Sequence, residues 1–193
     1  VQTHVPDDYA RLVYGHGNDQ PFTVPVGPQP EQIKLLTYAG LTAGYRGIIF
    51  SSDQSLSETA QGRDRMLQLA LLDLELSLIE PFLASSVDPP VLLKTSHPHV
   101  GAALFSHKRG RLVVPYWKQP DSQFVVGHAS VHELNVVVEN IQEDAQAFQV
   151  STGEVRALKR KRDLGGVRII IPEFDQASII VLTADVLLFD HYH

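Results

Sequence analysis

The stretch from Pro28 to Leu83 constrains the fold of this chain more than any other part of the sequence. It predicts a helix, a short buried strand at Gly47–Phe50, a polar loop and a long apolar helix. This order is the smallest unit of a parallel α/β architecture, in which each strand needs parallel neighbours. Few other segments could pair with this strand in parallel, so we expect the α/β part to be incomplete by itself.

Local signals in this stretch define the helix ends. Pro30 suits the first helical position, Glu31 complements the positive end of the helix dipole, and Gly44 suits a left-handed cap. The segment Gln61–Leu83 is apolar around most of its circumference, which predicts a helix with partners on most sides. Polar residues 51–54 follow the predicted strand, at the end where chemistry occurs in barrels and doubly wound folds.

The pattern changes after the break at Ser85–Pro90. Short alternating segments separated by turns follow, and Leu134, Val136 and Val138 share one face of such a segment. Many short strands at a spacing of roughly 8–12 residues indicate an antiparallel β-sandwich. The predicted fold class is therefore α/β plus all-β, with an α/β segment at residues 1–86 and an antiparallel β-sandwich at residues 87–193.

Composition excludes several classes of function. A formal net charge of −6 argues against nucleic acid as the main partner, and no apolar run approaches the ~20 residues that span a bilayer. The absence of cysteine excludes disulfides and thiolate metal sites. The sequence contains no nucleophile elbow, phosphate loop or dinucleotide fingerprint, so no cofactor is expected. The basic run Lys159–Arg162 is interpreted as a solvated hairpin end.

The chain begins VQTHVPDDY, without an initiator Met and without the basic and apolar regions of a signal peptide. We expect it to begin within a domain and to be the tail of a larger enzyme.

The segment PEQIKLLTYAGLTAGYRGIIFSSD resembles the last helix–strand step of glycoside-hydrolase-like (β/α)8 barrels. In that family a Pro-Glu-x-Ile start, a Tyr-containing helix and a Gly-x-x-Gly turn lead into the final barrel strand. The following SLSETAQGRDRMLQLALLDLEL is similar to the excursion into the final helix, and the segments RGRLVVPYW and VRIIIPEFDQASIIVLTAD resemble the β-sandwich that often follows.

This resemblance implies a carbohydrate-active protein, namely the C-terminal portion of a glycoside-hydrolase-like protein that acts on or binds a glycan. Such enzymes use two carboxylates across the sugar, and in the families it resembles both are carried on earlier strands. A whole barrel has eight strands, so another chain or an oligomer would complete the α/β part. The resemblance slightly favours an extracellular or periplasmic location.

Four residues are candidates for the site. Asp53 could bind sugar hydroxyls or support a catalytic carboxylate, although a loop Asp more often caps a turn. His4 is the second catalytic candidate if Val1–Val5 is the preceding barrel strand, although a lone His there is more often structural. Tyr116 and Trp117 could stack on a sugar, whereas the only Trp of a sandwich more often packs in the core.

Two alternatives stay open. The sandwich could be a non-catalytic carbohydrate-binding or interaction module. The chain could also be a His-based metalloenzyme, because His97 and His99 are spaced to share a strand face, His107 could join them across a hairpin, and imidazole suits Zn or Cu. His191 and His193 have the same spacing, but chain ends are usually mobile, so no metal ligand is predicted.

Overall fold

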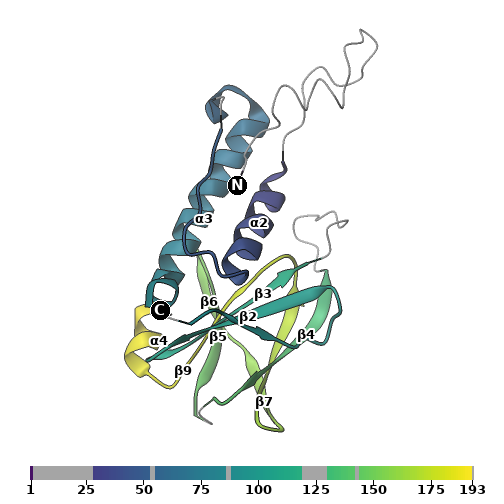
Figure 1. The fold of residues 1–193 in the computed structure, drawn as a ribbon, viewed down its shortest axis with the longest axis vertical. Helices are drawn as coiled ribbons and strands as arrows, with labels where there is room; N and C mark the ends of the chain where they lie inside the picture. Colours follow the sequence, from purple (N-terminus) through teal and green to yellow (C-terminus); the bar gives the residue numbers. More distant parts are fainter. Residues whose placement is uncertain (2–27, 53–54, 86–87, 119–129, 142–143, 193) are drawn as a thin grey trace.

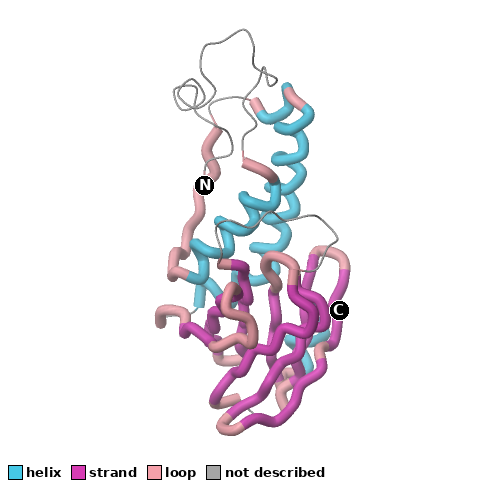
Figure 2. Tube along the Cα trace, turned by 90° about the vertical axis from the view of Figure 1, so that its right-hand side faces the viewer, coloured by secondary structure: helices cyan, strands magenta, loops and turns pink. Residues whose placement is uncertain are grey.

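The computed structural model describes Val1 and residues 28–52, 55–85, 88–118, 130–141 and 144–192 (Figure 1). These residues form three layers, with helices on one side, a six-stranded sheet in the middle and a three-stranded sheet on the other side (Figure 1 and Figure 2). The two sheets together make the predicted antiparallel β-sandwich.

The helical layer consists of α2 (Pro30–Thr42) and α3 (Ala60–Ser85), with the short 3-10 helix η1 (Leu56–Glu58) before α3. Pro30 occupies the first turn of α2 as predicted, and the backbone N–H of Gln29 donates to Oε1 of Gln32 at 2.8 Å. Gly44 follows the helix with a φ of +102°, which confirms the predicted left-handed residue at this end.

The sheets contain only antiparallel pairs among their named strands. The six-stranded sheet has the order β1 (Val91–Leu93), β2 (Val100–His107), β3 (Gly110–Trp117), β9 (Ile179–Thr183), β5 (Gln146–Ser151) and β6 (Glu154–Ala157). The three-stranded sheet has the order β4 (Val131–Glu139), β8 (Gly166–Phe174) and β7 (Lys159–Asp163), and the chain continues after β9 into α4 (Val186–Tyr192).

The core between the two sheets follows the period-two pattern of the sequence. Leu134, Val136 and Val138 of β4 are fully buried there, and Leu134 and Val136 lie beside their cross-strand partners Ile171 and Ile169 of β8 in the same cluster. Alternate residues of a strand point to opposite faces, so the residues between them reach the outer surface of the sandwich. The alternation in the sequence therefore predicted this face correctly.

A second core lies between the six-stranded sheet and the helices. Phe105 of β2 and Val114 of β3 are fully buried there with Leu72, Ile79 and Phe82 of α3. The middle sheet is thus covered on both faces, which explains why its central strands are continuous apolar runs although they are antiparallel.

The segment Gly47–Phe50 is not the buried strand that its apolar run predicts. It belongs to neither sheet, and the side chain of Ile49 is 82% exposed. Ile48 and Phe50 pack against the helix-side core, so two apolar residues of the run are partly buried without a surrounding sheet. The described residues contain no parallel sheet at this position, so the barrel-like organisation of the N-terminal part stays a proposal.

Residue Val1 is nevertheless bonded to this segment. Its amino group donates to the carbonyl oxygen of Ile49 at 2.6 Å, and the N–H of Ser51 donates to the carbonyl oxygen of Val1 at 3.1 Å. These two bonds bracket Phe50 in the pattern of a parallel bridge.

Helix α3 is less covered than its composition predicts. One side packs on the sheet, but Leu67, Leu71 and Leu74 on another side are 61%, 46% and 56% exposed. The reason is geometric, because a flat sheet and one neighbouring helix cover only part of a helix circumference. Of the described helices, none combines the length and apolar character needed to cross a membrane.

The division into residues 1–86 and 87–193 stays a prediction. In the structure, α2 and α3 share the helix-side core with the middle sheet. The described residues of the two segments are therefore packed on each other.

Candidate functional site

The two predicted catalytic residues, Asp53 and His4, lie outside the described residues. Ser51 and Ser52, which lead to Asp53, follow the segment that is bonded to Val1. The catalytic roles of Asp53 and His4 therefore stay predictions.

Tyr116 and Trp117 are adjacent in β3 and point to opposite faces of the middle sheet. The Trp117 side chain is 8% exposed and belongs to the core between the sheets, whereas Tyr116 packs on the helix side. The Tyr116 ring lies against Gly101, where an added Cβ would come within 2.8 Å of Cε1. The two rings thus cannot form one stacking platform, and their predicted role in substrate binding concerns two separate faces.

Trp117 does form an aromatic cluster with two histidines that precede β2. The His97 and His99 ring centroids lie 5.4 Å and 6.1 Å from that of Trp117, and 5.6 Å from each other. His97 is half-buried and His99 is exposed. We call these three side chains the Trp117–histidine cluster.

Backbone contacts hold this cluster at one end of the middle sheet. The hydroxyl of Thr95 lies 2.9 Å from the carbonyl oxygen of His97 and 2.8 Å from that of Val100, which fixes the turn into β2. The N–H of Lys118 donates to the carbonyl oxygen of His99 at 2.9 Å, so the end of β3 is tied to the same turn.

A buried amide lies beside the cluster. The N–H of Trp117 donates to the carbonyl oxygen of Gln176 at 2.7 Å, and Gln176 is 6% exposed. Its side-chain Nε2 has no hydrogen-bond partner within the described part of the chain. Buried polar atoms are almost always paired, so this donor is an exception among the described residues. An aromatic ring and imidazole nitrogens are groups that can contact a sugar.

The hypothesis that His107 joins His97 and His99 in a metal site is wrong. His107 ends β2 while His97 and His99 precede its start, and eight strand residues separate the two ends by about 23 Å. The His107 ring instead packs edge-on against Phe82 at 5.5 Å. Among the residues that the structure describes, no group of three His, Asp or Glu side chains is arranged to hold a metal ion.

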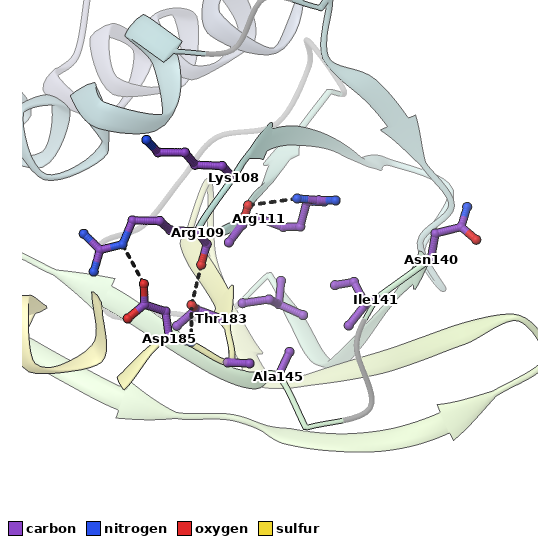
Figure 3. Close-up of a pocket in the computed structure, with 11 residues that line it drawn as sticks. Lys108, Arg109, Arg111, Asn140, Ile141, Ala145, Thr183 and Asp185 are labelled. Carbon is purple, nitrogen blue, oxygen red and sulfur yellow. Dashed lines mark hydrogen bonds and ion pairs between the residues drawn. The ribbon is translucent and has the colours of Figure 1, made fainter. Parts of the chain in front are cut away.

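A polar pocket of about 410 Å³ lies at this far end, around the β2–β3 hairpin (Figure 3). Its lining includes Lys108, Arg109 and Arg111 from the hairpin and Asp185 after β9. Nε of Arg109 donates to Oδ2 of Asp185 at 2.6 Å. This bond raises the pKa of the Arg109 guanidinium and lowers the pKa of the Asp185 carboxyl. We call this cavity the hairpin pocket.

Sequence reasoning assigned no function to the hairpin pocket. Residues 107–110 were identifiable as a turn, but the residues that complete the cavity lie near positions 140 and 184, far away along the chain. The only local signal was the concentration of three basic residues between His107 and Leu112.

No protein-family model matches the chain, and no curated protein is similar to it in sequence. Among solved structures, α-L-fucosidase isoenzyme 2 from Paenibacillus thiaminolyticus is 13% identical over 65% of this chain and 18% of that chain, with a TM-score of 0.38. The Thermotoga maritima α-fucosidase is 11% identical over 88% of this chain and 37% of that chain, with a TM-score of 0.46. A Thermotoga maritima α-L-fucosynthase is 14% identical over 88% of this chain and 36% of that chain, with a TM-score of 0.44. The chain therefore spans between about a fifth and just over a third of the length of these proteins.

Proposed function

We propose that the chain is the C-terminal portion of a glycoside-hydrolase-like, carbohydrate-active protein. In this proposal, α2, the segment 47–52 and α3 are the last step of a (β/α)8 barrel, and the sandwich follows the barrel. The catalytic carboxylates then belong to earlier barrel strands, in the same polypeptide or in another chain that completes the barrel.

The observation that carries the proposal is the parallel bridge between Val1 and Phe50. The helix α2 lies between these two residues along the chain, so the proposal interprets the two hydrogen bonds as the remaining contact of a strand–helix–strand crossover. Parallel neighbours require such a crossover, and it is the repeating unit of the barrel. In a barrel, the residues that follow the second strand would point to the active-site face, and here they are Ser51, Ser52 and Asp53.

Hydrolysis tests the proposal directly. The full-length protein is incubated with a panel of aryl glycosides that includes α-L-fucosides, and the released phenol is measured. We expect Asp53→Asn and His4→Ala to lower kcat/KM on the order of 10²-fold, the usual effect of losing a group that assists acid–base chemistry. Asp64→Asn, an exposed carboxylate change on α3, is the matched control. Activity that survives both site substitutions would refute the assignment of these residues. Absence of hydrolysis across the panel would refute the proposal that the protein is a glycoside hydrolase.

A second candidate function is non-catalytic glycan binding by the sandwich. The Trp117–histidine cluster favours it, because it places an aromatic ring and two imidazoles together at one end of the sheet.

Glycan binding is best tested at the histidines. Trp117 is 8% exposed in the core, and truncation of a buried aromatic side chain costs about 3–5 kcal/mol, so Trp117→Ala would confuse binding with folding. His99→Ala changes an exposed residue and should weaken glycan binding in calorimetry while the melting temperature is unchanged. His132→Ala, an exposed histidine on β4, is the control. Equal affinities for both variants would exclude the cluster as the binding site.

A further inference from the structure

We propose that the hairpin pocket binds an oxyanion, a sulfate or carboxylate group, with Arg111 as the principal contact and Lys108 as a second cation. The pocket takes such a group from an acidic glycan. The glycan part of this inference rests on the proposed function, whereas the anion part rests only on the geometry of the pocket.

Arg111 is oriented by the backbone of its own hairpin. Its Nη1 donates to the carbonyl oxygen of His107 at 2.9 Å and to that of Gly110 at 3.2 Å. Within the described part of the chain these are its only hydrogen bonds, so Nε and Nη2 keep their donors. A half-buried guanidinium with a fixed orientation and two remaining donor groups fits the two oxygens of a carboxylate or sulfate.

Arg109 and Arg111 have different partners and point to opposite sides of the pocket (Figure 3). Arg109 is paired with Asp185, and Oδ1 of Asp185 also accepts from the N–H of Leu187 at 3.0 Å. The single carboxylate among the described lining residues is thus already engaged by a guanidinium and by the start of α4. Arg111 and Lys108 form no ion pair with any described residue.

The lining therefore has an excess of positive charge, although the whole chain has a formal charge of −6. It contains three cations and one carboxylate among its described residues. The pKa of the neighbouring His107 is lowered, first by burial and then by the positive charges of Lys108 and Arg109. The two charge effects agree with a positive potential at this hairpin. An anion entering this cavity meets the donors of Arg111 and Lys108, whose charges no carboxylate among the described residues neutralises.

A second basic cavity, of about 470 Å³, lies next to the first because Ile141 lines both. Its wall includes Arg160, Lys161 and Arg162 of β7. Its one carboxylate, Asp163, accepts from Nε and Nη2 of Arg168 at 2.9 Å and 2.7 Å. Arg111 points toward the side of the hairpin pocket where Asn140 lies (Figure 3). Lys161 of this second cavity is the further cation that the inference assigns to a ligand with repeated anionic groups, such as a sulfated or uronate-containing oligosaccharide.

Calorimetric titration of the full chain with inorganic sulfate, a sulfated oligosaccharide, an oligogalacturonate and a neutral oligosaccharide tests this inference. The acidic oligosaccharides should bind, with an affinity that falls as salt is added, and the neutral one should not bind at this site. Arg111→Gln should weaken binding about 10- to 100-fold, the effect of losing a charged hydrogen-bonding partner. The matched control is Arg63→Gln on α3, because Nη1 of Arg63 likewise donates to a backbone carbonyl oxygen, that of Ser57 at 3.2 Å.

Two further variants guard against a folding artefact. Lys108→Gln changes an exposed side chain that makes no hydrogen bond with any described residue, and it should weaken binding several-fold without changing the melting temperature. Asp185→Asn should have the opposite effect on affinity, because removal of the carboxylate should release Arg109 and tighten anion binding. Asn also caps helices well, so the start of α4 keeps a capping side chain.

The outcomes separate the two proposals. Absence of binding by sulfate and by both acidic oligosaccharides, or an Arg111→Gln effect no larger than that of Arg63→Gln, overturns the anion site, whatever the hydrolysis assay shows. Binding of sulfate that depends on Arg111, without tighter binding of the acidic oligosaccharides, overturns the glycan part alone. Tighter binding of a single-stranded RNA at the same residues also overturns the glycan part. Hydrolysis of neutral glycosides with no anion binding refutes this inference and leaves the proposed function intact.

Discussion

Replacement of Tyr38 by Phe tests how the helical layer is held together. The Tyr38 hydroxyl donates to Oε2 of Glu75 at 2.7 Å, and Nζ of Lys34 donates to Oε1 of the same carboxylate at 2.7 Å. Tyr38 is 1% exposed and Glu75 is 8% exposed, so this network joins α2 to α3 in a buried position. Phe fills the same ring volume, and the substitution therefore removes the hydrogen bond without opening a cavity.

A hydrogen bond to a charged group contributes about 1.5–3 kcal/mol to stability. We expect Tyr38→Phe to lower the free energy of unfolding by about 2 kcal/mol, because Glu75 keeps its bond to Lys34. For a chain of this length each kcal/mol shifts the melting temperature by about 2–4 °C, so the expected loss is about 4–8 °C. Urea unfolding with an unchanged m-value would attribute the loss to the native state.

The matched control is Tyr45→Phe, since the Tyr45 side chain is 67% exposed. Its effect should lie within about 0.5 kcal/mol of zero. If Tyr38→Phe were as mild as this control, the carboxylate network would contribute nothing, and the description of how α2 is fixed to α3 would be wrong.

Alkaline pH gives a second check on the same residue. Burial, followed by the charge of Glu75 and the hydrogen bond to it, raises the pKa of Tyr38 well above its ordinary value of 10.0. The folded state thus favours the neutral phenol, and its contribution is fully present below pH 10 and lost as the pH rises through the folded pKa. The stability difference between the wild type and Tyr38→Phe should therefore shrink above pH 10. Burial also raises the pKa of Tyr192 to about 12, so a similar loss from Tyr192 should persist in the variant.

Three other substitutions follow from the packing. Gly166→Ala would place a Cβ 2.2 Å from the carbonyl oxygen of Val138, so it should lower stability by about 1–3 kcal/mol in urea unfolding, whereas Gly153→Ala, with open space around it, should be nearly neutral. Phe82→Ala removes a ring that is 1% exposed in the helix-side core and should cost about 3–5 kcal/mol. Asp185 has a pKa lowered by its hydrogen bond to Arg109, so its contribution is present above its ordinary pKa of 3.8 and lost as the pH falls. The difference in melting temperature between Asp185→Asn and the wild type at pH 7 should therefore shrink as the pH falls below 3.8.

The sandwich was predictable because apolar and more polar residues alternate along its strands. Leu134, Val136 and Val138 recur with a period of two, and in a strand this period places them on one face whatever lies opposite. The ends of α2 were predictable for a similar reason, because Pro30 and Gly44 act through their own backbone conformations.

The fate of Gly47–Phe50 was not predictable in the same way. An apolar run indicates burial but does not say against what. In the structure Ile48 and Phe50 reach the helix-side core while Ile49 is exposed. The run was interpreted as a buried parallel strand, and the helices that flank it instead cover an antiparallel sheet.

The candidate sites show the same difference. Sequence reasoning selected Trp117 and also offered the correct alternative, that it packs in the core. It treated Trp117 and Tyr116 as one platform, although adjacent residues of a strand point to opposite faces of the sheet. It also did not separate His107 from His97 by the length of β2. It missed the hairpin pocket, because the charge balance there depends on Asp185 meeting Arg109 across a separation of 76 residues.

The sequence by itself therefore determined the local features: the strands of the sandwich, the helix ends and the absence of thiol chemistry. These depend on the periodicity and backbone preferences of neighbouring residues. The tertiary structure alone decided that the helices cover the middle sheet, that Val1 pairs beside Phe50, and that the cations of one hairpin outnumber the carboxylate that reaches them. These features arise from contacts between residues far apart in the chain, and no local pattern specifies which distant surface a residue meets.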